Sequence, residues 1–269
     1  MIPRLCPPLW SLDPVGLDEL VACAALQTRF DRKYLLPVQR VPELLAGLDP
    51  ATRVLEIDGR RSFGYESVYF DTPDLVSYRL ATYRRRRRFK IRTRTYLDSN
   101  QCWLEVKTRG ARECTVKDRL PYEPAWRDAI TPGRDYVDHV LDNLAIDSRR
   151  MSFSPTLISR YDRITLLLPG AAARVTIDTD LAFEAADCRR LHLPGLVIVE
   201  TKTGATPSAV DRALWTGSLR PIRISKYGTG LAALRPDLPA LPWRRTLRRH
   251  FPAPEGLGTT EAIRWLSAS

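Results

Sequence analysis

The sequence contains little cysteine and little histidine. Its 269 residues include five cysteines, none of them in a C-x-x-C pair, and three histidines. Ligands so few and so scattered argue against a structural zinc site, and an odd number of cysteines argues against a disulfide framework. We therefore expect a protein of the reducing cytoplasm, with its cysteine side chains buried as small apolar groups.

Long apolar segments are also missing. No apolar run approaches the roughly 18 residues that a membrane-spanning helix needs. Residues 1–16 carry prolines and an aspartate where a signal peptide would have its apolar core. We therefore expect neither a transmembrane helix nor a signal peptide, while peripheral attachment to the inner face of a membrane through arginines stays open.

Lysine is rare although the protein is strongly basic. Lysine and arginine together number 42 against 31 acidic residues, a net charge of +11, and because only six are lysines, 36 are arginines. Such a charge predicts a polyanionic partner: nucleic acid, anionic lipid or a phosphate-rich small molecule. The compact charge of lysine suits a site crowded with phosphate oxygens. The lysines therefore mark candidate site segments: Lys33, Lys90, Lys107, Lys117, Lys202 and Lys226.

Residues 84–109 contain two stretches in which ionic side chains alternate with apolar or hydroxyl-bearing ones. In the first stretch the cations occupy every second position: Arg88, Lys90, Arg92 and Arg94. In the second stretch the corresponding positions hold Trp103, Glu105, Lys107 and Arg109. A period of two predicts β-strands, and the turn-forming segment 98–100 predicts that they form a hairpin. Because one face of this hairpin is almost entirely cationic, it needs an anion to relieve its repulsion.

The rest of the chain repeats this strand pattern between helical segments. We expect further strands at residues 28–36, 67–71, 112–120, 157–168, 173–181 and 196–202. Apolar residues at helical spacing predict helices at residues 17–26, 37–48, 136–144 and 207–215. Residues 224–230 are expected to form a turn that leads into a last apolar helix. From Arg235 onward we expect a loose basic tail with one short helix at residues 261–266.

These segments predict an α+β protein in which about eight antiparallel strands close into a barrel. The apolar faces would pack outward under the helices: Phe89, Ile91, Leu104, Val106, Val175, Ile177, Val197 and Val199. The ionic faces would line a water-filled, cation-lined tunnel, because unpaired charges are too costly to bury in a dry one. The carboxylates between the cations would be Asp31, Glu105, Glu113, Asp178 and Glu200. We expect an N-terminal lead (1–27), the tunnel domain (28–235) and a basic, proline-containing tail (236–269).

Eight short motifs occur in one order along the chain: RKYLL, SVYFDT, RTRTY, LEVKT, SRYDR, RVTIDTDL, VETK and ISKYG. Together, over residues 28–235, they resemble the polyphosphate-polymerase domain of the vacuolar transporter chaperone (VTC) family, which belongs to the triphosphate tunnel metalloenzymes. The resemblance implies an antiparallel barrel whose tunnel is lined by lysine and arginine. It also implies transfer of the γ-phosphoryl group of ATP to a polyphosphate chain, with Mg²⁺ or Mn²⁺ as the metal.

Motif matching with this family implies a role for each site residue. The catalytic tunnel residues would be Lys33, Arg92, Arg94, Lys107, Arg163, Arg174, Lys202 and Lys226. Tyr161 and Ser225 would bind substrate beside them, and Glu200 would be the metal ligand. Lys117 and Arg119 are added as substrate-binding residues because they alternate on the third strand. No serine or cysteine nucleophile is needed, because the phosphoryl acceptor is a phosphate oxygen.

Two departures from the family pattern matter. Many tunnel hydrolases begin with an E-x-E-x-K strand that supplies metal ligands, whereas this sequence has Arg29, Asp31 and Lys33 at those positions. The difference disfavours a hydrolase and leaves Glu200 as the main metal candidate. The sequence also has no room for the inositol-phosphate sensor and membrane helices of fungal members, so regulation and export would need other proteins, including a separate membrane partner.

Two other functions stay open. One is a tunnel triphosphatase that hydrolyses tripolyphosphate or a nucleoside triphosphate. The other is non-enzymatic binding of polyanions, among which nucleic acid is disfavoured, because the cationic faces carry few aromatic side chains for base stacking. Single features also have simpler interpretations: residues 84–88 as a solvated basic rim, Glu105 as half of a salt bridge on a wet surface, and Asp178 as the ion-pair partner of an arginine. The sequence does not predict the oligomeric state.

Overall fold

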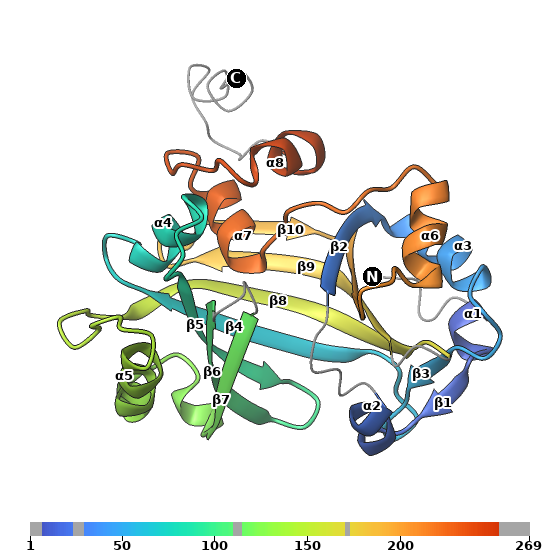
Figure 1. Cartoon of the computed structure of the whole chain (residues 1–269), viewed down its shortest axis with the longest axis horizontal. Coiled ribbons are helices and arrows are strands. Elements are labelled where there is room, and N and C mark those ends of the chain that lie inside the picture. The colour runs from blue at the N-terminus through green and yellow to red at the C-terminus, as the bar shows by residue number, and fades with distance from the viewer. Residues whose placement is uncertain (1–6, 24–29, 110–114, 170–172, 253–269) are drawn as a thin grey trace. The chain divides into compact units, whose positions relative to one another are not determined.

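The computed structural model describes residues 7–23, 30–109, 115–169 and 173–252 (Figure 1). The chain divides into two compact units. Unit 1 contains Met1–Gly64, Tyr161–Leu181 and His192–Ile222, and unit 2 contains Tyr65–Arg160, Ala182–Leu191 and Arg223–Ser269. The strands that contribute residues to both units are β4 (Phe63–Asp71), β8 (Ser154–Leu167), β9 (Arg174–Ala185) and β10 (Arg190–Leu193). Both units are built on mainly antiparallel β-sheet with helices, as the alternating sequence pattern predicts.

Unit 1 has a sheet with the strand order β2 (Phe30–Pro37), β11 (Leu196–Thr203), β9 and β8. Neighbouring strands run antiparallel between β2, β11 and β9, and β3 (Arg53–Leu55) pairs antiparallel with β8. A short strand, β1 (Asp13–Val15), pairs with β3 in parallel. In this register Glu200 lies opposite Lys33 on one neighbouring strand and opposite Thr176 on the other. The register therefore brings the ionic positions of separate strands into contact.

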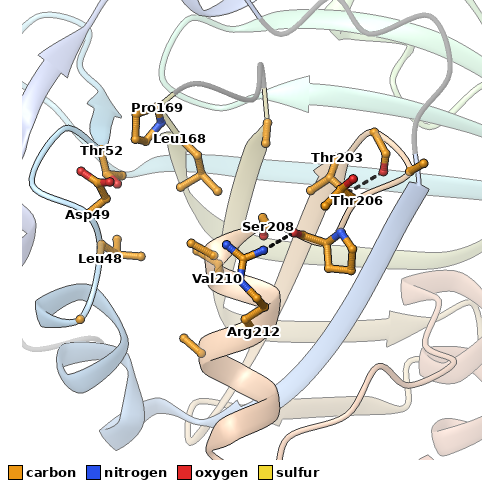
Figure 2. Close-up of a pocket in the computed structure, with 17 residues that line it drawn as sticks. Leu48, Asp49, Thr52, Leu168, Pro169, Thr203, Thr206, Ser208, Val210 and Arg212 are labelled. Atoms are coloured by element: carbon orange, nitrogen blue, oxygen red, sulfur yellow. Dashed lines mark hydrogen bonds between the residues drawn. The ribbon is translucent and has the colours of Figure 1, made fainter.

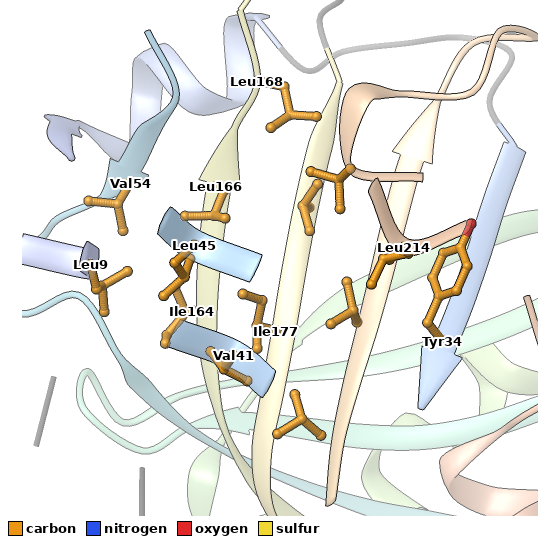
Figure 3. Close-up of a cluster of buried hydrophobic side chains, with 14 of the residues drawn as sticks. Leu9, Tyr34, Val41, Leu45, Val54, Ile164, Leu166, Leu168, Ile177 and Leu214 are labelled. Atoms are coloured by element: carbon orange, nitrogen blue, oxygen red, sulfur yellow. The ribbon is translucent and has the colours of Figure 1, made fainter. Parts of the chain in front are cut away.

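One face of the unit 1 sheet is apolar and carries the core. Alternate residues of the four strands supply it, among them Tyr34, Ile164, Ile177, Val197 and Val199, all 3% exposed or less. The helices α3 (Val41–Ala46) and α6 (Ala209–Thr216) cover this face with side chains such as Val41, Leu45 and Leu214 (Figure 3). Each such side chain contributes about 1.5–3 kcal/mol when fully buried, so the helices hold to the face by the hydrophobic effect. The ionic side chains are left on the opposite face.

A buried carboxylate fixes α6 in place. Ser208 caps the helix by accepting a hydrogen bond from the Asp211 backbone N–H at 3.1 Å, and the Asp211 carboxylate accepts one from the Ser208 N–H at 2.7 Å. The same carboxylate accepts hydrogen bonds from Tyr34 Oη and Thr201 Oγ1, both at 2.7 Å. Burial alone would raise the pKa of Asp211, but these donors outweigh it and lower the pKa.

Unit 2 contains the predicted hairpin, formed by β5 (Phe89–Tyr96) and β6 (Gln101–Arg109). On one side β5 pairs with β4, and on the other β6 pairs with β7 (Thr115–Tyr122), in both cases antiparallel. The turn spans residues 97–100, with Asn100 at a positive φ of 53°, a conformation that asparagine tolerates well. The helix α5 (Arg134–Asp142) packs Val137 and Leu141 on the apolar face of these strands. Phe89, Ile91, Leu104 and Val106 are 2% exposed or less, which confirms their predicted burial.

The expected turn at residues 224–230 is wrong, because α7 (Lys226–Leu234) already begins inside it. The two glycines of this segment allow close packing. A Cβ on Gly228 would collide with the Trp243 ring, and one on Gly230 would collide with the Phe183 ring. The helix α4 (Val76–Thr82) is tied to α7 by the Asp71 carboxylate, which accepts hydrogen bonds from the Tyr78 N–H at 2.8 Å and Tyr227 Oη at 2.5 Å.

The expected loose tail is also packed where the structure describes it. Residues 244–250 form α8 (Arg244–His250), and Trp243, Leu247 and Phe251 are 6% exposed or less. The predicted helix at residues 261–266 lies outside the described residues. The cysteine prediction is wrong for two of the three described cysteines, since Cys23 and Cys188 are exposed and only Cys102 is buried.

Closure of the sheet into a barrel is not confirmed. Among the described residues β2 pairs only with β11, and β7 pairs only with β6, so each of these strands is an edge strand. The remaining elements are short: α1 (Pro7–Trp10), α2 (Leu17–Cys23), η1 (Val38–Arg40), η3 (Pro124–Trp126) and η4 (Thr131–Gly133). None of the helices in the described part of the chain has the length and apolarity to cross a lipid bilayer.

Candidate functional site

The predicted site residues are distributed over both units, and all of them are described. Unit 1 holds Lys33, Tyr161, Arg163, Arg174, Glu200 and Lys202. Unit 2 holds Arg92, Arg94, Lys107, Lys117, Arg119, Ser225 and Lys226. We call the ionic side of β5, β6 and β7 the unit 2 face, and the ionic side of β2, β11, β9 and β8 the unit 1 face. Glu113, a predicted tunnel carboxylate, and Arg29, at the first position of the E-x-E-x-K pattern, lie outside the described residues.

Among the described residues, the unit 2 face carries seven cations and one carboxylate on its three strands. The cations are Lys90, Arg92, Arg94, Lys107, Arg109, Lys117 and Arg119, and the carboxylate is Glu105. The register places Lys107 directly opposite Lys90 on β5 and opposite Lys117 on β7. Like charges directly opposite one another on adjacent strands are destabilising, so this row of three lysines favours an anion above it. Lys90 was not assigned a role among the predicted site residues, although the rarity of lysine marked its segment, and the strand register now places it in this row.

Glu105 is the centre of the unit 2 face. It is 1% exposed and accepts hydrogen bonds from Arg92 Nε at 2.8 Å and Arg92 Nη2 at 2.5 Å. Lys117 Nζ lies 3.3 Å from Glu105 Oε1, and Arg94 Nη1 lies 3.9 Å from it. Burial would raise the pKa of Glu105, but the attraction of Arg92, Arg94 and Lys117 holds that pKa well below its usual range. The interpretation of Glu105 as half of a cross-strand salt bridge is confirmed, whereas its placement on a wet surface is wrong, because the carboxylate is buried.

Aromatic rings hold the arginines of this face in position. The guanidinium of Arg119 lies 4.5 Å from the centre of the Trp103 ring, within the range of a cation–π contact. Arg92 Nη1 donates a hydrogen bond to Tyr69 Oη at 3.1 Å. Rigid arginines can accept a phosphate without first losing side-chain entropy.

The N-terminus of α7 contributes to the site in unit 2. Ser225 caps the helix, since its Oγ accepts a hydrogen bond from the Gly228 N–H at 3.1 Å. The same oxygen accepts a hydrogen bond from Lys90 Nζ at 3.0 Å. Lys226 is the first residue of the helix, where the helix dipole favours anions. The predicted residues Ser225 and Lys226 are thus tied to the lysine row of the unit 2 face through Lys90.

On the unit 1 face, the predicted lysines Lys33 and Lys202 lie beside the carboxylate of a third predicted residue, Glu200. Glu200 Oε1 lies 3.2 Å from Lys202 Nζ and 3.9 Å from Lys33 Nζ. Burial lowers the pKa of Lys202 to about 8, although the Glu200 carboxylate counteracts this, and the Arg163 and Arg174 guanidiniums lower it further.

A second ion pair on this face joins Arg163 to Asp178. Arg163 Nε donates to Asp178 Oδ1 at 2.6 Å and Nη2 donates to Oδ2 at 2.8 Å, a bidentate pair. Asp178 is fully buried, which confirms its interpretation as the ion-pair partner of an arginine. The Arg163 guanidinium also lies 5.2 Å from the centre of the Tyr161 ring, and Tyr161 is only 3% exposed. Counting Asp31, the described part of the unit 1 face has four cations (Lys33, Arg163, Arg174, Lys202) and three carboxylates (Asp31, Asp178, Glu200).

The carboxylates do not form a complete metal site by themselves. Among the described residues no group of three or more histidine, cysteine, aspartate or glutamate side chains could hold a metal ion. Glu200 fits a more limited role, because Mg²⁺ is commonly bound through one or two carboxylates while water and substrate phosphates complete its coordination.

Unit 1 also contains a pocket of about 530 Å³ beside the N-terminus of α6 (Figure 2). Its walls include Leu48, Asp49, Leu168 and Thr206, and its one cationic lining residue, Arg212, donates to the Pro207 carbonyl at 2.8 Å. None of the predicted site residues lines it. With one guanidinium and one carboxylate in its lining, this pocket is a poor match for a triphosphate.

Comparison with known proteins gives one family and several distant structures. The sequence matches the family described as the VTC domain over residues 28–235. No curated protein matches it significantly. Among solved structures, HpAC1 from Hippeastrum, for which a dominant triphosphatase activity is described, is 16% identical with a TM-score of 0.45, over 79% of this chain and 99% of that one. A candidate adenylate cyclase from Bacillus halodurans is 13% identical with a TM-score of 0.46, over 72% of this chain and 92% of that one. A candidate adenylate cyclase from Vibrio parahaemolyticus is 12% identical with a TM-score of 0.37, over 71% of this chain and 84% of that one. Similarity this distant does not establish a shared activity.

Proposed function

Because this chain belongs to the VTC domain family, we propose that it is an ATP-dependent polyphosphate polymerase, which transfers the γ-phosphoryl group of ATP to a polyphosphate chain. The observation that carries the proposal is the lysine row of the unit 2 face, in which the strand register sets Lys107 between Lys90 and Lys117. Arg92 and Arg94 lie on the same face, where the Glu105 carboxylate holds them. A chain of phosphates suits such a row of cations, because it carries many negative charges along a narrow line.

The unit 2 face has the chemistry to hold phosphates. Arginine offers a fork of donors that matches two phosphate oxygens, and lysine neutralises charge as a point cation. We assign the grip on the phosphate chain to Arg92 and Arg94, which Glu105 orients, and charge neutralisation to Lys90, Lys107 and Lys117. Ser225 and Lys226, at the start of α7, are assigned to binding a phosphate oxygen.

We assign the metal to the unit 1 face. Glu200 would hold Mg²⁺ or Mn²⁺, which, when bound, neutralises charge on the phosphate oxygens. Lys33 and Lys202, both within 4 Å of the Glu200 carboxylate, would donate hydrogen bonds to phosphate oxygens. Arg163 and Arg174 would stabilise the charge that spreads over the transferred group.

The proposed reaction needs no protein nucleophile. A terminal phosphate oxygen of the polyphosphate attacks the γ-phosphorus, a new P–O bond forms, and the bond from the γ-phosphorus to the bridging oxygen breaks. The electron pair of that bond leaves with ADP, and the chain grows by one phosphate. Positioning and charge stabilisation by the cations account for the catalysis.

The test is incubation of the purified protein with ATP and Mn²⁺, followed by resolution of the products by chain length on a gel. The proposal expects long polyphosphate and ADP in matching amounts. Release of free phosphate without chains would instead show a triphosphatase. Tight polyphosphate binding without turnover of ATP would show a polyanion-binding protein and would refute the polymerase.

A further inference from the structure

The helix α8 presents a cluster of arginines outside both ionic faces. Its sequence RRTLRRH places Arg244, Arg245, Arg248 and Arg249 around a hollow of about 370 Å³ on unit 2, and these four are its lining residues within the described part of the chain. Thr246 and Leu247 are 6% exposed or less, so they bind the helix to unit 2. The cluster is therefore held on a packed helix and opens to solvent.

Like charges dominate the α8 cluster. Arg244 and Arg248, and likewise Arg245 and Arg249, are four residues apart, a spacing at which like charges destabilise a helix. Among the described residues no carboxylate forms an ion pair with any of the four, whereas other arginines of unit 2 have such partners, for example Arg134 with Asp138 and Arg235 with Asp237. A concave surface lined by four guanidiniums favours an external anion.

The geometry of α8 favours an anion with several phosphates. Arginines four positions apart are separated by about 6 Å along a helix, at a rise of 1.5 Å per residue, so two phosphates of one chain can be held at the same time. Attachment to a lipid surface is disfavoured, because the apolar residues Trp243, Leu247 and Phe251 are buried in unit 2 and cannot enter a membrane. Base stacking by a nucleic acid is disfavoured for the same reason, since the two aromatic rings that flank the helix are buried.

We propose that the α8 cluster is a second phosphate-binding site, which holds polyphosphate chains at a place separate from the two ionic strand faces. The choice of polyphosphate as the ligand rests on the proposed function, while the site itself rests on the hollow and its four arginines. A chain long enough to contact α8 as well as an ionic face binds more tightly than a short one, because the second contact becomes intramolecular.

The experiment compares the full chain with a variant in which Arg244, Arg245, Arg248 and Arg249 are all replaced by glutamine, which preserves helix propensity. Binding of end-labelled long-chain polyphosphate and of tripolyphosphate is measured by fluorescence anisotropy at several salt concentrations. The matched control replaces Arg84, Arg85, Arg86 and Arg87 by glutamine, which removes the same charge from another exposed segment of unit 2. Thermal unfolding of each variant verifies that it is folded.

We expect the α8 variant to bind long polyphosphate about tenfold or more weakly, with a salt slope lower by roughly 3, since each lost phosphate contact on a single-stranded polyanion removes about 0.7. Tripolyphosphate binding is expected to stay unchanged. Equal losses in the control variant, or unchanged binding of long polyphosphate, would overturn the proposal. The proposal would also be overturned if the α8 variant lost binding to phosphatidylglycerol vesicles or to single-stranded RNA while its binding of polyphosphate stayed intact.

The outcome is separable from that of the proposed function. If the unmodified protein makes no polyphosphate from ATP but its binding of long chains depends on α8, the polymerase proposal fails and the second site stands. If the protein makes polyphosphate and the α8 variant binds long chains normally, the second site fails and the polymerase stands.

Discussion

The two ionic faces differ in how their charges are compensated. Among the described residues, the unit 1 face sets three carboxylates against four cations, whereas the unit 2 face sets one carboxylate against seven. On the unit 1 face, Asp178 holds Arg163 in a bidentate pair, and Glu200 lies between two lysines. On the unit 2 face, the register sets three lysines directly opposite one another. Among the described residues, the comparison therefore indicates that carboxylates compensate the cations of the first face more fully than those of the second.

This difference assigns separate roles to the two faces. A nearly neutral face can hold a metal ion on a carboxylate without first losing a bound anion. A strongly cationic face gains most from binding phosphates, because the bound charge relieves repulsion that is already present. Substitutions on the two faces should therefore have different effects, and the predictions below are ordered from the largest to the smallest.

The largest effect is expected for Glu200→Gln on the unit 1 face. The amide cannot bind the metal as a carboxylate does, so we expect turnover of ATP to fall about 100-fold or more, which corresponds to several kcal/mol of lost charge stabilisation. Binding of Mn²⁺ in the presence of a non-hydrolysable ATP analogue, followed by electron paramagnetic resonance, should weaken in parallel. Glu43→Gln is the matched control, since Glu43 is an exposed glutamate of the same unit. If the Glu200 variant binds Mn²⁺ as tightly as the wild type does, the metal site is not on this face.

The second prediction concerns Glu105→Gln on the unit 2 face. Loss of this charge leaves the buried Arg92 without its counter-ion, and removal of one partner of a buried ion pair costs about 3 kcal/mol. Urea denaturation at pH 7 should show this loss as a lower free energy of unfolding. An unchanged free energy of unfolding would mean that water, and not Glu105, compensates Arg92.

The pH dependence of the same variant sharpens the test. The pKa of Glu105 in the folded protein is held below its ordinary value of 4.5, so the carboxylate stabilises the folded state fully above about pH 4.5. This contribution is lost as the pH falls further towards the folded-state pKa. The difference in unfolding free energy between the wild type and the glutamine variant should therefore be constant from pH 7 to about 5 and should shrink below that.

A third prediction addresses the lysine row. Lys107→Met keeps the length of the side chain but removes the central charge of the row. Tripolyphosphate should therefore bind about tenfold more weakly, which corresponds to a loss of about 1.4 kcal/mol in binding free energy. The free energy of unfolding without ligand should rise slightly, because Lys90 and Lys117 lose a like-charged neighbour. Opposite signs for stability and affinity distinguish a binding residue from a structural one. Calorimetry and urea denaturation measure the two quantities, and Arg149→Gln, on an exposed arginine, serves as the control.

The smallest effect is expected for Ser225→Ala, compared with Ser208→Ala. Each serine caps a helix, so each substitution should lower the free energy of unfolding by about 1 kcal/mol. Only Ser225 also accepts a hydrogen bond from Lys90, and therefore only Ser225→Ala should weaken tripolyphosphate binding, by about two- to threefold. Equal affinities of the two variants for tripolyphosphate would exclude the start of α7 from the site.

The alternation of side chains predicted the two sides of each strand, but not which residues become neighbours. Lys90, Lys107 and Lys117 form a row only because the β5–β6 turn holds residues 97–100, which pairs Tyr96 with Gln101. A shift of one residue would move every side chain to the other face, and composition does not encode the length of a turn. The position of Glu105 at the centre of three cations depends on the same register.

The turn expected at residues 224–230 is the clearest error. A local pattern with Gly228 and Gly230 is typical of a turn, since glycine weakens helices by about 1 kcal/mol relative to alanine. The structure shows that Trp243 and Phe183, which lie far from these glycines in the sequence, occupy the space that side chains would fill. Such tertiary packing overrides local propensity, and a single sequence does not reveal it.

The same packing has a consequence for the start of α7. Trp243 lies against Gly228, and the Asp71 carboxylate accepts a hydrogen bond from the hydroxyl of Tyr227. These two side chains, which are not assigned to ligand binding, anchor the first turn of the helix. The cap at Ser225 is therefore preorganised when the chain folds, and an arriving phosphate need not order this backbone. Because these anchors belong to the interior of unit 2, they can change the affinity of the first turn for anions without themselves contacting a ligand.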